Sequence, residues 1–258
     1  MLATSTISGM AGTTTMRGSS LILLSLQFVS AWAAAAASNP TAAAPRLKVL
    51  CMHGYSQNGA VLRDRSGGFR KPFKKSRFEM SYPDGLFGCT KDGEDQDEAD
   101  ADLQRRAWWR GHSGQETYVG WDESHAAMCE LWERERFDGV IGFSQGAAAA
   151  AMLCAELKPR FGIFVAGFVP NDRAAAAALL SGVDASVPTL HVIGTADSLV
   201  TPERSMALAD LFDGRTVVTH PGGHMIPSAA HVRGQVASFV EAALVECQQP
   251  EAECTVRL

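Results

Sequence analysis

The chain has 258 residues, of which 46% are hydrophobic and 20% are charged, and its formal net charge is −5. This is the composition of a globular protein, and the length suits a single catalytic domain. The 23 Lys and Arg residues are scattered along the chain, which argues against a surface that binds nucleic acid.

The first 44 residues differ from the rest, because they contain no acidic residue and a single arginine, Arg17. Their apolar run at 21–37 is short for a membrane span but suits a signal peptide, while the many Ser and Thr residues also suit an organelle transit peptide. A disordered extension or an upstream start codon would give the same pattern. We expect an N-terminal extension at 1–44, a folded domain at 45–246 and a C-terminal tail at 247–258.

From residue 46 onward, short apolar runs alternate with longer segments of helical periodicity. The expected strands are 47–52, 78–82, 139–143, 162–166, 189–193 and 216–219. The expected helices are 59–73, 121–136, 145–157, 171–180, 202–211 and 228–247. This alternation predicts an α/β fold in which about six mostly parallel strands have helices on both faces.

The six cysteines include no C-x-x-C pair and show no spacing typical of a zinc site or a disulfide framework. We therefore expect free thiols. Cys51 lies in an expected strand and Cys154 in an Ala-rich helix, so both are expected to be small core residues and not nucleophiles.

The pentapeptide Gly-Phe-Ser-Gln-Gly at 142–146 follows the expected strand 139–143 and precedes the Ala-rich helix 145–157. A sharp turn between strand and helix can hold a serine in a strained conformation, and glycines two residues to either side leave the space that this turn needs. We expect Ser144 to project above the sheet as a nucleophile.

A serine hydroxyl needs a base to take its proton and an acid to orient that base. Asp197 follows the strand 189–193 and His224 follows the strand 216–219, so both lie past carboxyl ends of strands, where open parallel sheets place their sites. The chain order Ser, Asp, His is that of α/β-hydrolases. We predict an α/β-hydrolase fold with Ser144, Asp197 and His224 as its catalytic triad.

Other residues compete for two of these roles. His220 could be the base, but it lies closer to the strand, whereas the glycines at 222–223 give a later imidazole the freedom to reach the serine. Asp184 or Asp213 could be the acid, although Asp213 comes too early to follow a strand. His220 and His224 have a spacing found in metal sites, but no third ligand is in view, so we expect no metal.

Acyl transfer also needs hydrogen-bond donors aimed at the oxyanion of the tetrahedral intermediate. One should be the backbone amide of Gln145, directly after the nucleophile, and the other should come from the loop at 53–59 after the first strand. Within that loop we choose the amide of Tyr55. His53 is expected to hold the loop by hydrogen bonds and not to act as a second base.

A short insertion between the second strand and the helix at 121–136 contains two adjacent tryptophans, Trp108 and Trp109. Insertions at this place can cover an active site. With Phe87 and Phe168, which lie on loops near the strand ends, the tryptophans could form an apolar acyl pocket. They could equally be ordinary packing for the insertion.

With these motifs assembled, the chain resembles the FSH family of serine hydrolases over residues 46–243. The resemblance rests on LCMHGYSQN at 50–58, AWW at 107–109, GFSQGA at 142–147, GTAD at 194–197 and HPGGH at 220–224. It implies hydrolysis of a small-molecule carboxylic ester, often with an alkyl chain, without a cofactor, in the cytoplasm or nucleus. The N-terminal extension departs from the family's compact form, so a secreted or organellar location stays open.

Two other functions remain open at this point. Acyl-protein thioesterases and lysophospholipases also carry Gly-Phe-Ser-Gln-Gly around the nucleophile, although the tryptophan pair argues against them. A non-catalytic protein could use the same fold to hold a small ligand, although an intact triad argues against that. We expect no obligatory membrane partner, and the oligomeric state does not follow from the sequence.

Overall fold

The computed structural model describes residues 46–74, 77–89, 105–110, 117–184 and 186–246, all within the unit Pro45–Leu258. The expected extension at 1–44 and the expected tail at 247–258 lie outside the described residues. Across the described ranges, none of the helices combines the length and the apolar character needed to cross a membrane.

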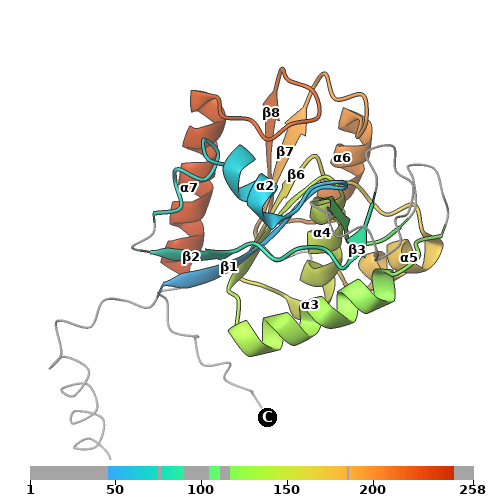
Figure 1. Cartoon of the computed structure of the whole chain (residues 1–258). Helices are drawn as coiled ribbons and strands as arrows, with labels where there is room; N and C mark the ends of the chain where they lie inside the picture. Colours follow the sequence, from blue (N-terminus) through green and yellow to red (C-terminus); the bar gives the residue numbers. More distant parts are fainter. Residues whose placement is uncertain (1–45, 75–76, 90–104, 111–116, 185, 247–258) are drawn as a thin grey trace, which may run out of the picture. The chain divides into compact units, whose positions relative to one another are not determined.

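Six parallel strands form one sheet in the order β2-β1-β5-β6-β7-β8 (Figure 1). The strands are β1 (Leu47–Met52), β2 (Phe78–Ser81), β5 (Gly139–Phe143), β6 (Phe161–Val165), β7 (Thr189–Gly194) and β8 (Arg215–His220). All six coincide with the strands predicted from the sequence, to within one residue at each end. The predicted parallel α/β sheet is therefore confirmed.

Helices cover both faces of this sheet, as predicted (Figure 1). They are α2 (Gly59–Arg65), α3 (Trp121–Glu135), α4 (Gln145–Leu157), α5 (Arg173–Gly182), α6 (Pro202–Ala209) and α7 (Ala230–Glu246). The core on one face includes side chains of α3, α4, α5 and α6, and the core on the other face includes side chains of α2 and α7.

Strand β1 shows how the sequence supplies both cores. Leu50 and Met52 belong to the core beneath α4, whereas Val49 and Cys51 belong to the core beneath α7. Side chains alternate between the two faces of a strand, so a strand buried on both faces reads as a continuous apolar run. The predicted burial of the Cys51 thiol follows from this position, since its side chain is 1% exposed.

The helix predicted at 59–73 is wrong in length, because α2 ends at Arg65 and Ser66 is its C-cap. Two consecutive glycines follow at 67–68, and each glycine disfavours a helix interior by about 1 kcal/mol relative to alanine. The structure also contains a small antiparallel sheet of β3 (Phe87–Gly88) and β4 (Arg106–Ala107) that the sequence did not predict. Strands of two residues are too short to show an alternating pattern.

The strand order positions the site. The chain adds β2 on one side of β1 and then β5 on its other side, so the direction of strand addition reverses at β1. In open parallel sheets, the loops at such a reversal diverge and leave a crevice beyond the carboxyl ends of the strands. The loop after β1 and the turn after β5 border this crevice.

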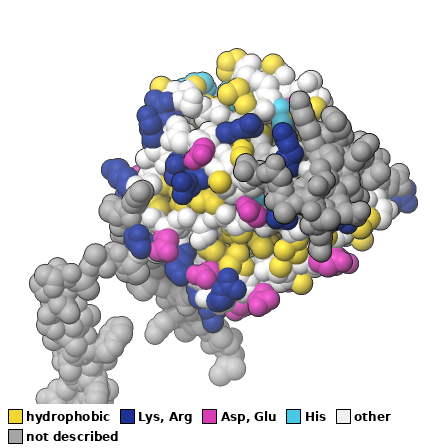
Figure 2. Space-filling view, viewed as in Figure 1, with side chains coloured by type: hydrophobic (Ala, Val, Ile, Leu, Met, Phe, Trp, Pro, Cys, Tyr) yellow, Lys and Arg dark blue, Asp and Glu magenta, His cyan; other side chains and the backbone are white. Residues whose placement is uncertain are grey.

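Charged side chains of both signs are interspersed on the face shown in Figure 2. Two ion pairs join the neighbourhood of β2 to other elements, Arg46 with Glu79 at 2.8 Å and Arg77 with Glu241 at 2.8 Å. Exposed pairs of this kind contribute about 0 to 1 kcal/mol each. The two apolar cores, and not these pairs, therefore hold the sheet and its helices together.

Candidate active site

Ser144 occupies a strained turn between β5 and α4, with φ 55° and ψ −119°. A Cβ atom on Gly142 would lie 2.2 Å from the carbonyl oxygen of Gly146, and one on Gly146 would lie 2.3 Å from the carbonyl oxygen of Met52. Both glycines are therefore needed for the helix to pass this close to the strands. The turn lifts the serine side chain above the end of the sheet.

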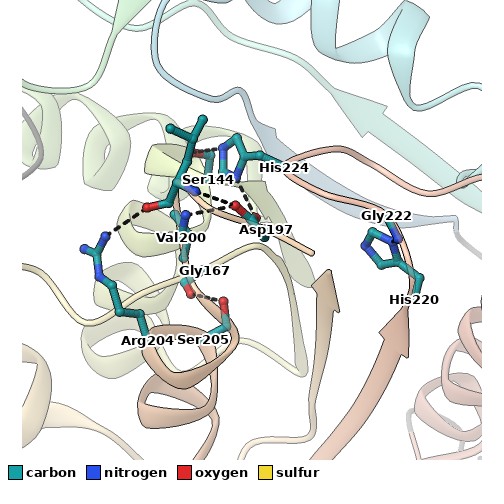
Figure 3. A network of polar contacts seen from close by, with 10 residues as sticks. Ser144, Gly167, Asp197, Val200, Arg204, Ser205, His220, Gly222 and His224 are labelled. Atoms are coloured by element: carbon teal, nitrogen blue, oxygen red, sulfur yellow. Dashed lines mark hydrogen bonds and ion pairs between the residues drawn. The ribbon is translucent and has the colours of Figure 1, made fainter. Parts of the chain in front are cut away.

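Ser144, His224 and Asp197 form a continuous chain of hydrogen bonds (Figure 3). His224 Nε2 lies 2.8 Å from Ser144 Oγ, and His224 Nδ1 lies 2.7 Å from Asp197 Oδ2. An ionised carboxylate can only accept, so the imidazole carries its proton on Nδ1 and its Nε2 accepts from the serine hydroxyl. This arrangement can move the hydroxyl proton to the imidazole.

The Asp197 carboxylate is held on both oxygens. Oδ1 accepts hydrogen bonds from the backbone N–H groups of Leu199 and Val200, each at 2.9 Å, while Oδ2 accepts from His224. Its side chain is 1% exposed. These three donors hold the carboxylate in a single orientation, and the carboxylate in turn fixes the orientation of the imidazole.

The loop that carries His224 packs against the end of β7. A Cβ atom on Gly194 would lie 2.6 Å from the carbonyl oxygen of Gly222 and 2.7 Å from that of Gly223. Glycine at position 194 therefore allows the loop to cross β7 and bring the imidazole to the serine. The ring of Phe143 supports the imidazole at a centroid distance of 5.0 Å.

The competing residues lie elsewhere. His220 is buried and separate from the triad in Figure 3, and its Nδ1 accepts a hydrogen bond from the backbone N–H of Gly222 at 3.2 Å. Burial lowers its pKa because it disfavours the charged imidazolium. Asp184 accepts hydrogen bonds from Ser186, and Asp213 lies on an exposed turn.

The loop after β1 is anchored through His53. The N–H of Gly85 donates to His53 Nε2 at 2.8 Å, so the proton lies on Nδ1, which donates to the carbonyl of Gly54 at 2.8 Å. Burial lowers the pKa of His53 to about 4, and the ring stays neutral. This loop brings Tyr55 to the same cavity as Ser144 and Gln145.

The Gln145 side chain fixes the tryptophan pair. Its Oε1 accepts from the backbone N–H of Trp108 at 2.9 Å, and its Nε2 donates to the carbonyl of Trp109 at 2.9 Å. The indole N–H of Trp108 donates in turn to the carbonyl of His53 at 2.8 Å. Gln145, a predicted oxyanion residue, thus ties the insertion to the start of α4, and the Trp108 indole ties the insertion to the loop after β1.

We expect Gln145→Leu to destabilise the fold by about 2 to 4 kcal/mol, because it leaves a buried N–H and a buried C=O without partners. The midpoint of urea denaturation measures this loss. Ser181→Ala removes an exposed hydrogen bond within α5 and should change stability by less than about 0.5 kcal/mol. Equal midpoints for Gln145→Leu and the wild-type protein would contradict the bridging role.

A cavity of about 410 Å³ opens beside the triad. Its lining consists of Tyr55, Trp109, Tyr118, Ser144, Gln145, Phe168, Asn171, Ser198, Leu199, Val200, Arg204 and His224. Two of the four aromatic residues predicted for a pocket, Trp109 and Phe168, are therefore part of this lining. Trp109 stacks on Tyr118 with a centroid distance of 4.5 Å.

The other two predicted aromatic residues do not line this cavity. Trp108 is fully buried, and its indole packs on the imidazole of His53 with a centroid distance of 4.9 Å. Phe87 packs against Gly120, and the guanidinium of Arg110 lies 5.0 Å over its ring. These two side chains are therefore packing residues and not part of the cavity lining.

Several residues of the cavity lining were not predicted from the sequence, namely Tyr118, Asn171, Ser198, Leu199, Val200 and Arg204. Most of them follow β6 and β7 or begin α6, so they lie past the carboxyl ends of strands like the triad itself. The rule that placed the triad could therefore have pointed to them. Tyr118 shows no such signal, since it depends on how the insertion folds back.

A second group of polar side chains lies away from this cavity, between α3 and α4. His125 Nε2 lies 2.6 Å from Glu156 Oε2, and Cys129 Sγ lies 3.6 Å from the same nitrogen. Burial followed by the charge of Glu156 raises the pKa of the Cys129 thiol to about 11. These are ligand types that Zn²⁺ accepts. Their proximity is not visible in the sequence, because they come from two helices.

The comparison with known proteins identifies a family for the chain. The family model described as Serine hydrolase (FSH1) matches residues 43–236. The relative named Esterase OVCA2 from Danio rerio is 34% identical over 225 residues, which cover 76% of this chain and 96% of that protein.

Solved structures share the fold at lower identity. SOBER1 of Arabidopsis thaliana is 18% identical with a TM-score of 0.58, covering 78% of this chain and 100% of the other. Acyl-protein thioesterase 2 of Zea mays is 20% identical with a TM-score of 0.56, covering 77% and 94%. These similarities support the α/β-hydrolase fold alone, whereas the family match spans most of the chain. The chain therefore belongs to the FSH1 family of serine hydrolases.

Proposed function

We propose that Ser144, His224 and Asp197 carry out the carboxylic ester hydrolysis of this enzyme through a covalent acyl-enzyme. The observation that supports this most is the hydrogen-bonded chain from Ser144 through His224 to Asp197, with distances of 2.8 and 2.7 Å, at the edge of a cavity that can hold a substrate. Each group has the partner that its role requires.

In the first half of the reaction, Ser144 Oγ attacks the ester carbonyl carbon and its proton passes to His224 Nε2. The backbone N–H groups of Tyr55 and Gln145 donate to the negative oxygen of the tetrahedral intermediate; in other enzymes, loss of one such donor slows the reaction by about 10²-fold to 10³-fold. The intermediate collapses, and His224 gives the proton to the departing alcohol.

In the second half, a water molecule attacks the acyl carbonyl while His224 takes one of its protons. Collapse of the second intermediate breaks the bond to Ser144 Oγ, which regains its proton from His224, and the carboxylic acid leaves. Asp197 holds the imidazole through both halves, so that one nitrogen exchanges the proton and the other stays bound to the carboxylate.

The acyl chain is proposed to lie in the cavity lined by Trp109 and Phe168. Leu199, in the cavity lining, is 66% exposed, and Met225, which follows His224 in the chain and lines a neighbouring pocket, is 49% exposed. Exposed apolar side chains beside a catalytic serine suit an alkyl chain better than a strongly hydrated substrate.

Asp197→Asn is expected to lower kcat on the order of 10⁴-fold. The oxygen of the new amide would stay with the N–H groups of Leu199 and Val200, so its NH₂ would face His224 Nδ1. The imidazole would then carry its proton on Nε2 and could not accept one from Ser144. Steady-state kinetics on a p-nitrophenyl ester measure the loss.

Asp213→Asn is the matched control, because Asp213 is exposed and was one of the two competing acids in the sequence. It should keep the wild-type kcat. If Asp197→Asn retained more than about a tenth of the wild-type kcat, Asp197 would not be the residue that orients the base.

A further inference from the structure

Arg204 is a positive charge in the wall of the proposed catalytic cavity. It lies in the first turn of α6, and Figure 3 shows it extending toward the segment that contains Val200. We propose that Arg204 forms an anion subsite that binds a carboxylate carried by the ester substrate. This inference rests on the proposed function and names the substrate class, esters with a second, ionised carboxyl group.

The protein itself uses little of the hydrogen-bonding capacity of Arg204. One amino group donates to the carbonyl of Leu199 at 3.4 Å and the other to Asn171 Oδ1 at 3.5 Å, both at the long end for such bonds. A guanidinium has five N–H donors. In the part of the chain that the structure describes, no carboxylate forms an ion pair with Arg204.

Nearby carboxylates are engaged by other donors. Asp172 accepts from the backbone N–H groups of Tyr118 and Ala175, as the N-cap of α5. Asp197 accepts from two backbone N–H groups and from the imidazole. The positive charge of Arg204 is therefore left for a group that enters the cavity.

Arg204 is also held in a fixed place. Its guanidinium lies 4.7 Å over the ring of Phe168, which is another cavity residue. Stacking on an aromatic face restrains the planar group while leaving its N–H edge available, and a fixed fork of donors matches the two oxygens of a carboxylate.

Tyr118 supplies a further donor beside it. Its hydroxyl oxygen accepts from the backbone N–H of Asn171 at 2.8 Å, so its own hydrogen remains to be donated. Burial raises the pKa of this hydroxyl, which keeps it protonated at neutral pH. The cavity thus has apolar side chains that suit a carbon chain, and it also has the hydrogen-bond donors of Arg204 and Tyr118, which suit a carboxylate.

The test compares esters that differ by a carboxylate. For the acyl side, the pair is mono-p-nitrophenyl adipate and the neutral p-nitrophenyl heptanoate. For the alcohol side, the pair is para-acetoxybenzoate and the neutral para-acetoxybenzamide. The readout is the ratio of kcat/KM for the charged ester to that for its neutral counterpart, and the pair that responds shows which side of the ester carries the carboxylate.

Arg204→Met keeps an unbranched stem over Phe168 and removes the charge. We expect it to lower the charged-to-neutral ratio for one pair by about tenfold or more, mainly through KM, and Arg204→Lys to restore part of the loss. Arg134→Met makes the same charge change on the exposed surface of α3 and should leave both ratios as in the wild-type enzyme.

A purely structural role for Arg204 would lower activity on charged and neutral esters alike, so both ratios would stay unchanged, and that result would overturn the proposal. Circular dichroism melts of Arg204→Met and Arg204→Lys show whether each variant is folded. Failure of the wild-type enzyme to hydrolyse even the neutral esters would instead refute the proposed function, so the two failures are distinguishable.

Discussion

Ser144→Ala should abolish ester hydrolysis, lowering kcat on the order of 10⁶-fold, because the acyl-enzyme can no longer form. The fold should survive, since the Ser144 side chain has a hydrogen bond to His224 as its described polar contact and alanine has the smaller side chain. The residual rate would come from binding and from donors to the oxyanion. Turnover of p-nitrophenyl esters gives the rate, and labelling by a fluorophosphonate probe reports the nucleophile directly.

Ser238→Ala is a suitable control, because Ser238 lies exposed on α7 and bonds only within its own helix among the described contacts. It should be labelled and turn over ester like the wild-type enzyme. Full labelling of Ser144→Ala by the fluorophosphonate would mean that another residue is the nucleophile, and the proposed mechanism would then be wrong.

The sheet and the three proposed catalytic side chains could be predicted because each depends on local sequence. The inner strands are mostly apolar runs between turn residues, and the edge strands β2 and β8 are short mixed runs that contain β-branched or aromatic residues, so their limits are visible without knowledge of their neighbours. Ser144, Asp197 and His224 each follow such a run. A parallel sheet places the carboxyl ends of its strands at one edge, and this rule alone brings together residues that lie 80 positions apart, as Ser144 and His224 do.

The part of the cavity wall that the insertion forms could not be predicted in the same way. Trp108 and Trp109 are adjacent and chemically alike, yet one is buried beneath the site and the other lines it. What separates them is the bridge from Gln145 to the backbone of both residues, which is a tertiary contact. The proposed role of Arg204 likewise depends on which carboxylates lie close enough to pair with its guanidinium, and the tertiary structure determines these distances.

The second large expected effect on kcat tests which of two histidines, His220 or His224, is the base. We expect His224→Ala to lower kcat by about as much as Ser144→Ala, on the order of 10⁶-fold, because Ser144 loses the base that takes its proton. In contrast to Ser144→Ala, this variant keeps the nucleophile, so the fluorophosphonate should still label it, but at a greatly reduced rate.

His220→Asn is the informative companion, because an amide oxygen can accept the hydrogen bond that His220 Nδ1 receives from the backbone N–H of Gly222. The loop should then keep its shape, and kcat should fall by less than about tenfold. If His220→Asn instead lost as much activity as His224→Ala, the base would have to be shared or reassigned between the two imidazoles. If His224→Ala kept most of its activity, the distance of 2.8 Å between the His224 imidazole and the Ser144 hydroxyl would have no catalytic meaning.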